Sequence, residues 1–203
     1  QKQAGFVDLL NYAAVVDEGV IVGKNGSFMA AWLYQGDDQA NTTDKAREMV
    51  AYQINQALSA MGSGWMVHVD AMRRAAPNYS DEAYSYFPDS VSMAVDEERR
   101  QLFENIGTLY EGYFVITLTW YPPVLAQKRF VALMFDDSHA RLSNRAKTHQ
   151  LIDAFKQACR TFESRMSSAV HLERLASEKL ITEDGQTVTH DNFLRHIQYC
   201  ATG

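Results

Sequence analysis

The chain has 203 residues, of which 46% are hydrophobic and 22% charged, with only 4 prolines and 11 glycines. This composition is typical of a globular protein and excludes the disordered, collagenous and disulfide-scaffold classes. Nineteen basic residues against 25 acidic ones leave a formal net charge of -6, which argues against bulk binding of nucleic acid or of an anionic membrane. No apolar run approaches the roughly 18 to 20 residues that span a bilayer, so we expect a soluble protein without a transmembrane segment.

The N-terminal part of the chain predicts a β-hairpin followed by a helix. Two β-branched and aromatic runs within residues 13–35 flank Gly23–Gly26, whose Asn-Gly pair is typical of a tight turn because both residues tolerate positive φ. After them, apolar residues recur at helical spacing up to Gly62, which supplies a left-handed stop. Either Thr42 or Thr43 can cap the start of this helix.

A half-buried strand is predicted over Trp65–Met72, where apolar and polar side chains alternate. The alternation places Met66, His68 and Asp70 on one face. His68 and Asp70 could then be two metal ligands, but no third ligand is visible at a spacing that would bring it near. A polar pair on the strand surface is therefore favoured, and a small metal-dependent hydrolase using His68 and Asp70 is kept as an alternative function.

The rest of the chain predicts loops, amphipathic helices and short strands. In chain order these are a loop over 73–90, a helix capped by Ser90 with an apolar stripe through Val91, Val95, Leu102, Ile106 and Leu109, a strand over 113–121, an apolar run over 130–135 that fits a strand or a helix, a helix over 151–166, a turn at Asp184–Gly185 and a helix over 191–200. This order predicts an α+β fold, in which a twisted mixed sheet with an N-terminal hairpin is covered by three or four amphipathic helices.

We expect residues 1–203 to form a single N-terminal domain of a longer protein, with a subdivision near residues 122–145 as the alternative. The chain begins at Gln1 without a methionine and ends at Gly203 directly after an amphipathic run, as a piece of a longer chain would.

Neither nucleotide nor cysteine chemistry is indicated by the motifs. Gly19–Asn25 approaches a P-loop, but it has three residues between its glycines instead of four and no hydroxyl residue after the lysine to hold Mg²⁺. A hairpin is the better interpretation, and we expect no bound cofactor. Cys159 and Cys200 lie far apart without the spacing of a zinc site or a disulfide framework, so we expect two reduced, metal-free thiols.

The densest charge run is Asp96–Arg100, on the helix that begins near Ser90. A solvated helix face is the default interpretation of such a run. The apolar stripe of this helix, however, passes between Glu98 and Arg99, whereas Asp96, Glu97 and Arg100 can point to water. Glu98 and Arg99 are therefore expected either to form a half-buried pair or to face a neighbouring subunit, and we favour the neighbouring subunit.

Four aromatic residues gather in the segment between Pro77 and Pro88 and make it a candidate contact surface. Exposed rings on a proline-stiffened loop bring a large contact area at low ordering cost. Two other arrangements stay open: the rings could fold back as a lid over the strand at 65–72, or they could stack the bases of a single-stranded nucleic acid, against which the missing cationic groove counts. These residues are Tyr79, Tyr84, Tyr86 and Phe87.

Several short sequence motifs, taken in chain order, resemble the N-terminal region of the TrbE/VirB/CagE family of conjugal-transfer and type IV secretion ATPases. The resemblance is closest to the TrbE branch of this family. The opening run from Tyr12 to Ser27 fits the same family. The other matching motifs are Gly62–Met66, Tyr84–Asp89 with its Phe-Pro-Asp, Asp96–Arg100 and Thr117–Pro123 with its Tyr-Pro-Pro.

The resemblance implies a subunit of a bacterial machine that energises pilus assembly or substrate transfer, cytoplasmic and peripheral to the inner membrane. In that family the P-loop motor, with its ATP and Mg²⁺, lies C-terminal to this region, so no ATP-binding residue can be assigned here. The chain is then expected to be a non-enzymatic docking and assembly domain. Its implied partners are inner-membrane subunits of the secretion machine and further copies of the full-length protein.

Overall fold

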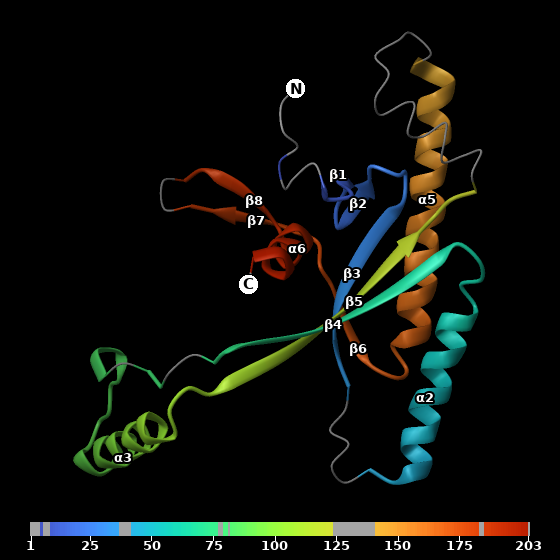
Figure 1. Cartoon of the computed structure of the whole chain (residues 1–203). Coiled ribbons are helices and arrows are strands. Elements are labelled where there is room, and N and C mark those ends of the chain that lie inside the picture. Colours follow the sequence, from blue (N-terminus) through green and yellow to red (C-terminus); the bar gives the residue numbers. More distant parts are fainter. Residues whose placement is uncertain are drawn as a thin grey trace. The chain divides into compact units, whose positions relative to one another are not determined.

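A computed structural model describes residues 5, 9–36, 42–76, 79–80, 82–123, 141–182 and 185–202. The chain forms two compact units, shown in Figure 1. Unit 1 comprises Gln1–Asp70 and Phe114–Gly203, and unit 2 comprises Ala71–Tyr113. The predicted subdivision near residues 122–145 falls largely outside the described residues, as does the ambiguous apolar run over 130–135.

An antiparallel sheet organises unit 1. Its strand order is β1-β2-β3-β5-β4, and β6 also pairs with β3. Every pairing whose register is known is antiparallel, and the predicted α+β class is confirmed. The strands are β1 (Tyr12–Asp17), β2 (Val20–Gly23), β3 (Phe28–Gln35), β4 (Trp65–Ala75), β5 (Tyr110–Trp120) and β6 (His171–Arg174).

The turns of the N-terminal strands explain why the near match to a P-loop is not a phosphate loop. Val20–Gly23 is a fully buried strand that pairs with β1 on one side and β3 on the other. The turn after it uses Gly26 at φ 78°, a conformation that glycine adopts without strain. The side chain of Asn25 completes the turn by accepting hydrogen bonds from the backbone N–H and the hydroxyl of Ser27.

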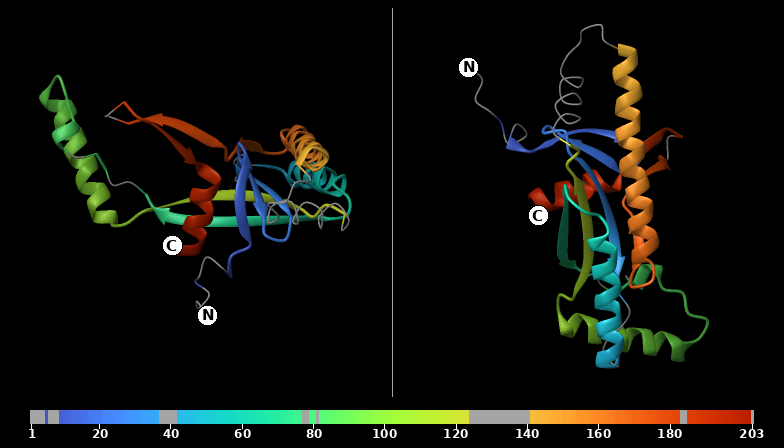
Figure 2. Two further views of the ribbon diagram at one scale, coloured as in Figure 1. Left: turned by 90° about the horizontal axis from the view of Figure 1, so that it is seen from above. Right: turned by 90° about the vertical axis from the view of Figure 1, so that its right-hand side faces the viewer.

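Two helices pack together against one face of the sheet and close the main core (Figure 2). These are α2 (Asp44–Ser59) and α5 (Arg141–Met166). Thr43 caps α2, because its hydroxyl accepts a hydrogen bond from the backbone N–H of Ala46. The largest buried side chains of this core are Phe28, Trp32, Leu118, Phe155, Phe162 and Met166.

The C-terminal part of unit 1 contains a second hairpin and the last helix. Strands β7 (Ser177–Ile181) and β8 (Thr187–Asp191) pair antiparallel, as the predicted turn between them requires. Helix α6 (Asn192–Thr202) begins directly afterwards. Asp191 joins the two, because its carboxylate accepts bonds from the Leu194 backbone N–H and the Ser177 hydroxyl.

Unit 2 consists of the outer ends of β4 and β5, the short helix η1 (Glu82–Tyr84) and helix α3 (Ser90–Ile106). The predicted cap of α3 is wrong by one residue: Asp89, not Ser90, accepts the N–H bonds of the first turn. The predicted loop over 73–90 also starts too early, since β4 continues to Ala75. No residue of α3 is buried.

Candidate functional site

A pocket of about 370 Å³ lies on the sheet of unit 1, lined by residues of β1, β3, β4, β5 and α6. Met66, His68 and Asp70 of β4 all line it, which confirms that they share one face of the strand. Thr117 and Thr119 line it from β5. These threonines alternate with Ile116 and Leu118 of the main core, so the pocket occupies the sheet face opposite to α2 and α5.

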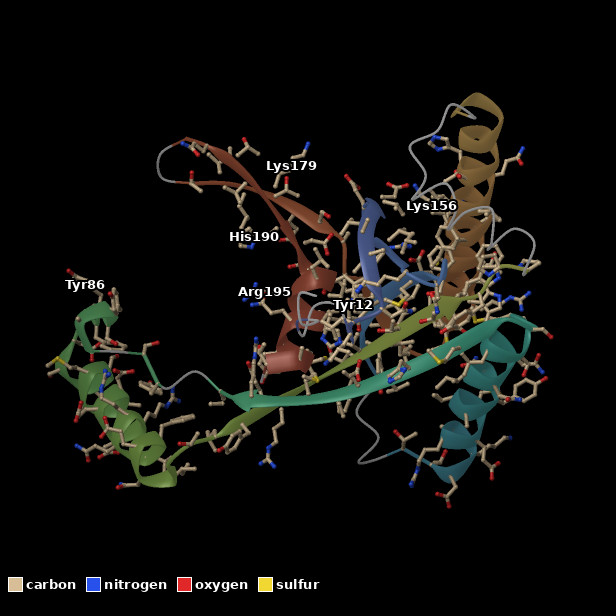
Figure 3. All side chains as sticks on the ribbon, turned by 45° about the horizontal axis from the view of Figure 1, so that its top comes forward. Tyr12, Tyr86, Lys156, Lys179, His190 and Arg195 are labelled. Atoms are coloured by element: carbon tan, nitrogen blue, oxygen red, sulfur yellow. The ribbon has the colours of Figure 1, made fainter. Side chains whose placement is uncertain are left out.

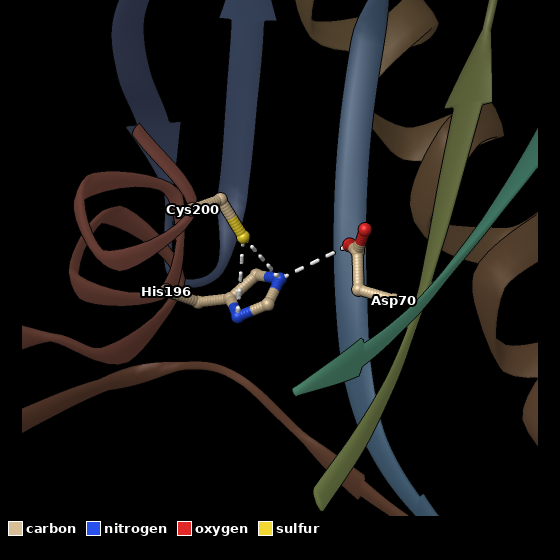
Figure 4. A group of neighbouring side chains, drawn as sticks. All are labelled: Asp70, His196 and Cys200. Carbon is tan, nitrogen blue, oxygen red and sulfur yellow. Dashed lines mark hydrogen bonds and ion pairs between the residues drawn. The ribbon is translucent and has the colours of Figure 1, made fainter. Parts of the chain in front are cut away.

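Three side chains of types that can ligate a metal meet in this pocket, as Figure 4 shows. Nε2 of His196 lies 3.2 Å from Oδ2 of Asp70 and 3.5 Å from Sγ of Cys200. One ligand atom from each of the three residues lies within 4.8 Å of the other two. His196 is buried and Asp70 half-buried, whereas Cys200 is exposed. A carboxylate, an imidazole and a thiol therefore face one small volume.

The local sequence of α6 explains how two of these side chains come to point the same way. Cys200 is the fourth residue after His196, and positions i and i+4 lie on one face of a helix. Phe193 is buried on the same helix, so that face turns toward the sheet. Asp191 caps the first turn and fixes where the helix begins.

The environment of the cluster raises the pKa of two groups, the Cys200 thiol and the Tyr12 hydroxyl, and so favours their neutral forms. Burial, and then the charge of Asp70, raises the pKa of the Cys200 thiol. Burial also raises the pKa of Tyr12, another residue of the pocket, with Cys200 and Asp70 adding to the effect. In the described chain, these three ligands could hold one metal ion in the way that borderline metals such as zinc prefer.

The alternative of a metal-dependent hydrolase at His68 and Asp70 gains no support from the described geometry. It pairs His68 with Asp70 as potential ligands, but the described group within 4.8 Å contains Asp70 with His196 and Cys200, and His68 is not part of it. The expectation that both thiols are metal-free is untested and stays a prediction. The i, i+4 pair of His196 and Cys200 is the signal that draws attention to α6.

In unit 2, the half-buried charge pair is Asp96–Arg100. Their side chains retain only 11% and 13% exposure, and Oδ2 of Asp96 lies 2.9 Å from Nη2 of Arg100. The prediction that Asp96 and Arg100 point to water is therefore wrong, because both turn toward the segment that precedes α3. There Tyr79 donates its hydroxyl to Asp96, and Arg100 also donates to the Ser80 carbonyl. Asp96 raises the pKa of Tyr79 through this hydrogen bond.

The remaining partner-contact candidates are exposed. Glu98 and Arg99 lie on the open surface of α3. Tyr84 and Tyr86 expose 85% and 94% of their surface, and Figure 3 shows the labelled Tyr86 at the turn before α3. Phe87 is less exposed, at 39%. The rings of these three residues are thus accessible to a partner within unit 2, whereas Tyr79 packs on Phe103 of α3.

The predicted apolar stripe of α3 exists but is uncovered. Every large apolar side chain on it is exposed, unlike those of the core helix α5. Together with the exposed rings before the helix, these residues define what we call the α3 surface: Tyr84, Tyr86, Phe87, Val91, Met93, Val95, Leu102, Phe103 and Ile106.

Comparison with known proteins assigns the chain to a family. Residues 19–128, more than half of the chain, match the model of the type IV secretion system ATPase VirB4/TrbE N-terminal domain. The conjugal transfer protein TrbE of Rhizobium radiobacter is 34% identical over 200 residues, which cover 98% of this chain and 24% of that protein. A probable conjugal transfer protein TrbE of Sinorhizobium fredii is 41% identical over 117 residues, covering 58% of this chain and 78% of that protein.

The chain therefore belongs to the VirB4/TrbE family of type IV secretion ATPases, as the sequence motifs predicted. It spans about a quarter of the length of the Rhizobium radiobacter relative and corresponds to the family's N-terminal domain. Within the described residues of the chain, no helix is both long and apolar enough to cross a bilayer.

Proposed function

We propose that this chain is the docking and assembly domain of a conjugal-transfer ATPase, and that it attaches the enzyme to an inner-membrane subunit of its secretion machine. The parent protein would energise pilus biogenesis or substrate transfer from the cytoplasmic side. ATP and Mg²⁺ would be bound by a motor outside the region described here, and this domain would take part without catalysis of its own.

The observation that carries the proposal is the α3 surface. A helix whose apolar stripe stays in water loses the free energy that burial would supply, about 25 cal/mol for each Å² covered. Large apolar side chains that stay exposed at helical spacing, as on α3, are typical of interaction sites. The aromatic residues Tyr84, Tyr86 and Phe87 are of the kind that dominates the energetics of protein interfaces.

A membrane subunit fits this surface better than nucleic acid does. Glu97, Glu98 and Glu104 are all exposed on α3, and acidic groups on this helix would repel a phosphate backbone. Arg99 is exposed among them, so the rim of the apolar stripe carries both signs of charge. A polar rim around an apolar centre is the usual anatomy of a protein interface.

Co-expression with defined partners tests the proposal. The chain would be produced with each inner-membrane subunit of its own transfer system in turn, and the complexes recovered from detergent-solubilised membranes. We expect one subunit to be retained at near-stoichiometric amounts. The double variant Leu102→Ser/Ile106→Ser should reduce this retention at least about tenfold, since two buried apolar contacts contribute more than the roughly 1.4 kcal/mol that a tenfold change requires.

A matched control is available on helix α2 of unit 1. Met49 and Tyr52 are exposed apolar residues of similar size, and Met49→Ser/Tyr52→Ser should leave retention unchanged. The proposal fails if no subunit is retained, or if both double variants weaken retention equally. Self-association of the chain through the same surface would be seen as a dimer in sedimentation without any membrane subunit, and it would replace this proposal.

A further inference from the structure

The cluster in the pocket of unit 1 contains three ligand types that zinc prefers, in nearly the spacing that zinc requires. Zinc with ordinary bond lengths in a tetrahedral arrangement separates a nitrogen from a sulfur ligand by about 3.6 Å and a nitrogen from an oxygen ligand by about 3.4 Å. Nε2 of His196 lies 3.5 Å from Sγ of Cys200 and 3.2 Å from Oδ2 of Asp70. Both distances agree with the tetrahedral values within about 0.2 Å.

The distance between the Asp70 carboxylate and the Cys200 sulfur is the third one that zinc binding requires. One carboxylate oxygen of Asp70 and Sγ of Cys200 lie within 4.8 Å of each other, against about 3.6 Å for oxygen and sulfur on one zinc. The two atoms would approach by at most about 1.2 Å, which rotation of the exposed Cys200 side chain on α6 can provide. Sγ also lies 4.0 Å from Nδ1 of His196, so the thiol lies against the ring, and the ring and the Cys200 side chain must both turn before the Nε2 lone pair and Sγ can share an ion.

We propose that Asp70, His196 and Cys200 form a zinc-binding site in the pocket between β4 and α6. Asp70 precedes His196 by 126 positions, so the ion would join the last helix of the chain to the sheet. Three protein ligands leave the fourth tetrahedral position for water. All three residues line a cavity of about 370 Å³, which has ample room for one water molecule.

An ordinary hydrogen-bonded cluster is the competing explanation for the same distances. In that case Asp70 accepts a proton from the His196 ring, and the Cys200 thiol contacts the ring as well. The two explanations differ in what the thiol does. Zinc binding replaces the Cys200 proton with the metal and releases that proton to solvent, while the hydrogen-bonded cluster keeps the thiol protonated.

Metal titration of the untagged 203-residue chain separates the two explanations. After dialysis against a chelator, the chain would be titrated with Zn²⁺ by calorimetry and with Co²⁺ by absorption spectroscopy. We expect one ion per chain, and with Co²⁺ an intense near-ultraviolet band from thiolate-to-metal charge transfer together with the visible bands of tetrahedral coordination. The zinc-loaded chain should also resist labelling of Cys200 by a maleimide.

Single substitutions then assign the ligands. Cys200→Ser should remove the charge-transfer band and weaken Zn²⁺ binding by more than about a hundredfold, because even changes to residues that only support the ligands of a zinc site cost roughly 10- to 100-fold. Asp70→Asn should weaken binding without abolishing the band. Two matched controls should bind like the unchanged protein: Cys159→Ala for the second thiol, and His68→Gln for the other histidine of the pocket.

Because Cys200 is exposed and the serine substitution is nearly isosteric, this variant is expected to fold, and circular dichroism checks that it does. The proposal is overturned if neither Zn²⁺ nor Co²⁺ binds stoichiometrically, or if Cys200→Ser keeps the affinity and the spectrum of the unchanged chain. Loss of the band in His68→Gln but not in Cys200→Ser would also overturn it. None of these outcomes bears on docking through α3, which lies in unit 2.

Discussion

Helices α5 and α3 carry the same kind of apolar stripe and use it in opposite ways. On α5, Phe155, Phe162 and Met166 are buried against the sheet of unit 1. On α3, Val95, Leu102 and Ile106 recur at equivalent helical spacing but remain exposed. The periodicity of a helix thus shows which face is apolar, whereas what covers that face depends on the rest of the fold.

The charged residues of the two helices also differ in what they contact. The polar face of α5 reaches the sheet through a partly exposed ion pair between Lys156 and Asp17, with 2.5 Å between Nζ and Oδ2. On α3, in contrast, it is the charge pair Asp96–Arg100 that packs against the preceding segment, while the apolar stripe stays outside. Within unit 2, local order therefore depends more on polar contacts than on a hydrophobic core.

The largest effect expected from this comparison is in the core of unit 1. Phe162 is fully buried and its ring lies 5.2 Å from that of Trp32. Phe162→Ala should lower the free energy of unfolding by about 3 to 5 kcal/mol, because it removes a large apolar side chain and leaves a cavity. Urea denaturation followed by tryptophan fluorescence measures this change.

Phe103→Ala on α3 is the matched control, since Phe103 is 39% exposed and packs only on Tyr79 among the aromatic contacts described. It should cost clearly less than the Phe162 substitution. Equal losses for both variants would show that α3 is buried in solution as deeply as α5, and the contrast between the helices would be wrong.

An intermediate effect is expected at the half-buried charge pair of α3. Removing Arg100 leaves the Asp96 carboxylate poorly solvated, so Arg100→Ala should lower stability by roughly 1 to 3 kcal/mol. Glu98→Ala and Arg99→Ala, at exposed positions of the same helix, should change stability by no more than about 0.5 kcal/mol. Thermal unfolding of the three variants ranks them, and a loss at Arg99 equal to that at Arg100 would mean that Arg99 is also half-buried in solution.

The smallest effect concerns pH and the ion pair between β1 and α5. The hydrogen bond from Lys156 lowers the pKa of Asp17 below its usual value of 3.8. Folding therefore favours the charged carboxylate: its contribution is complete above about pH 4 and is lost as the pH falls through the lowered pKa. Because both side chains are about a third exposed, that contribution should be below about 1 kcal/mol.

Asp17→Asn should therefore reduce stability slightly at neutral pH and flatten its decrease below about pH 4. Denaturation curves of the two proteins at neutral and acidic pH measure the difference. If the curves separate as the pH falls instead of converging, the pair does not stabilise the fold in the way proposed here.

Much of the local structure could be predicted from the sequence. The Asn-Gly turn, the Thr43 cap and the alternation along β4 are all confirmed, because each depends on residues close together in the chain. The motifs that resemble the family are also short stretches of sequence, and the comparisons with known proteins confirm the family they predicted. Errors at Asp89 and at the end of β4 are shifts of a few residues at element boundaries, where two adjacent residues can serve equally well as a cap.

The metal-ligating cluster could not be predicted in the same way. Asp70 and His196 are 126 residues apart, and no periodicity relates a strand position to a position on a distant helix. The i, i+4 spacing of His196 and Cys200 is visible in the sequence, but an isolated pair of this kind on a helix does not indicate a third ligand. Only the packing of α6 over the open face of the sheet brings the carboxylate to them.

The amino-acid sequence predicts the α+β class, most of the elements, the apolar face of each helix and the family. These follow from local backbone preferences and from the repeat of apolar residues, which act over a few residues at a time. The tertiary structure alone decided that α5 is covered and α3 is not, that Asp96 and Arg100 are the half-buried pair, and that Asp70 meets His196 and Cys200. The physical reason is that burial and proximity are properties of the assembled chain, set by which distant segments exclude water from one another.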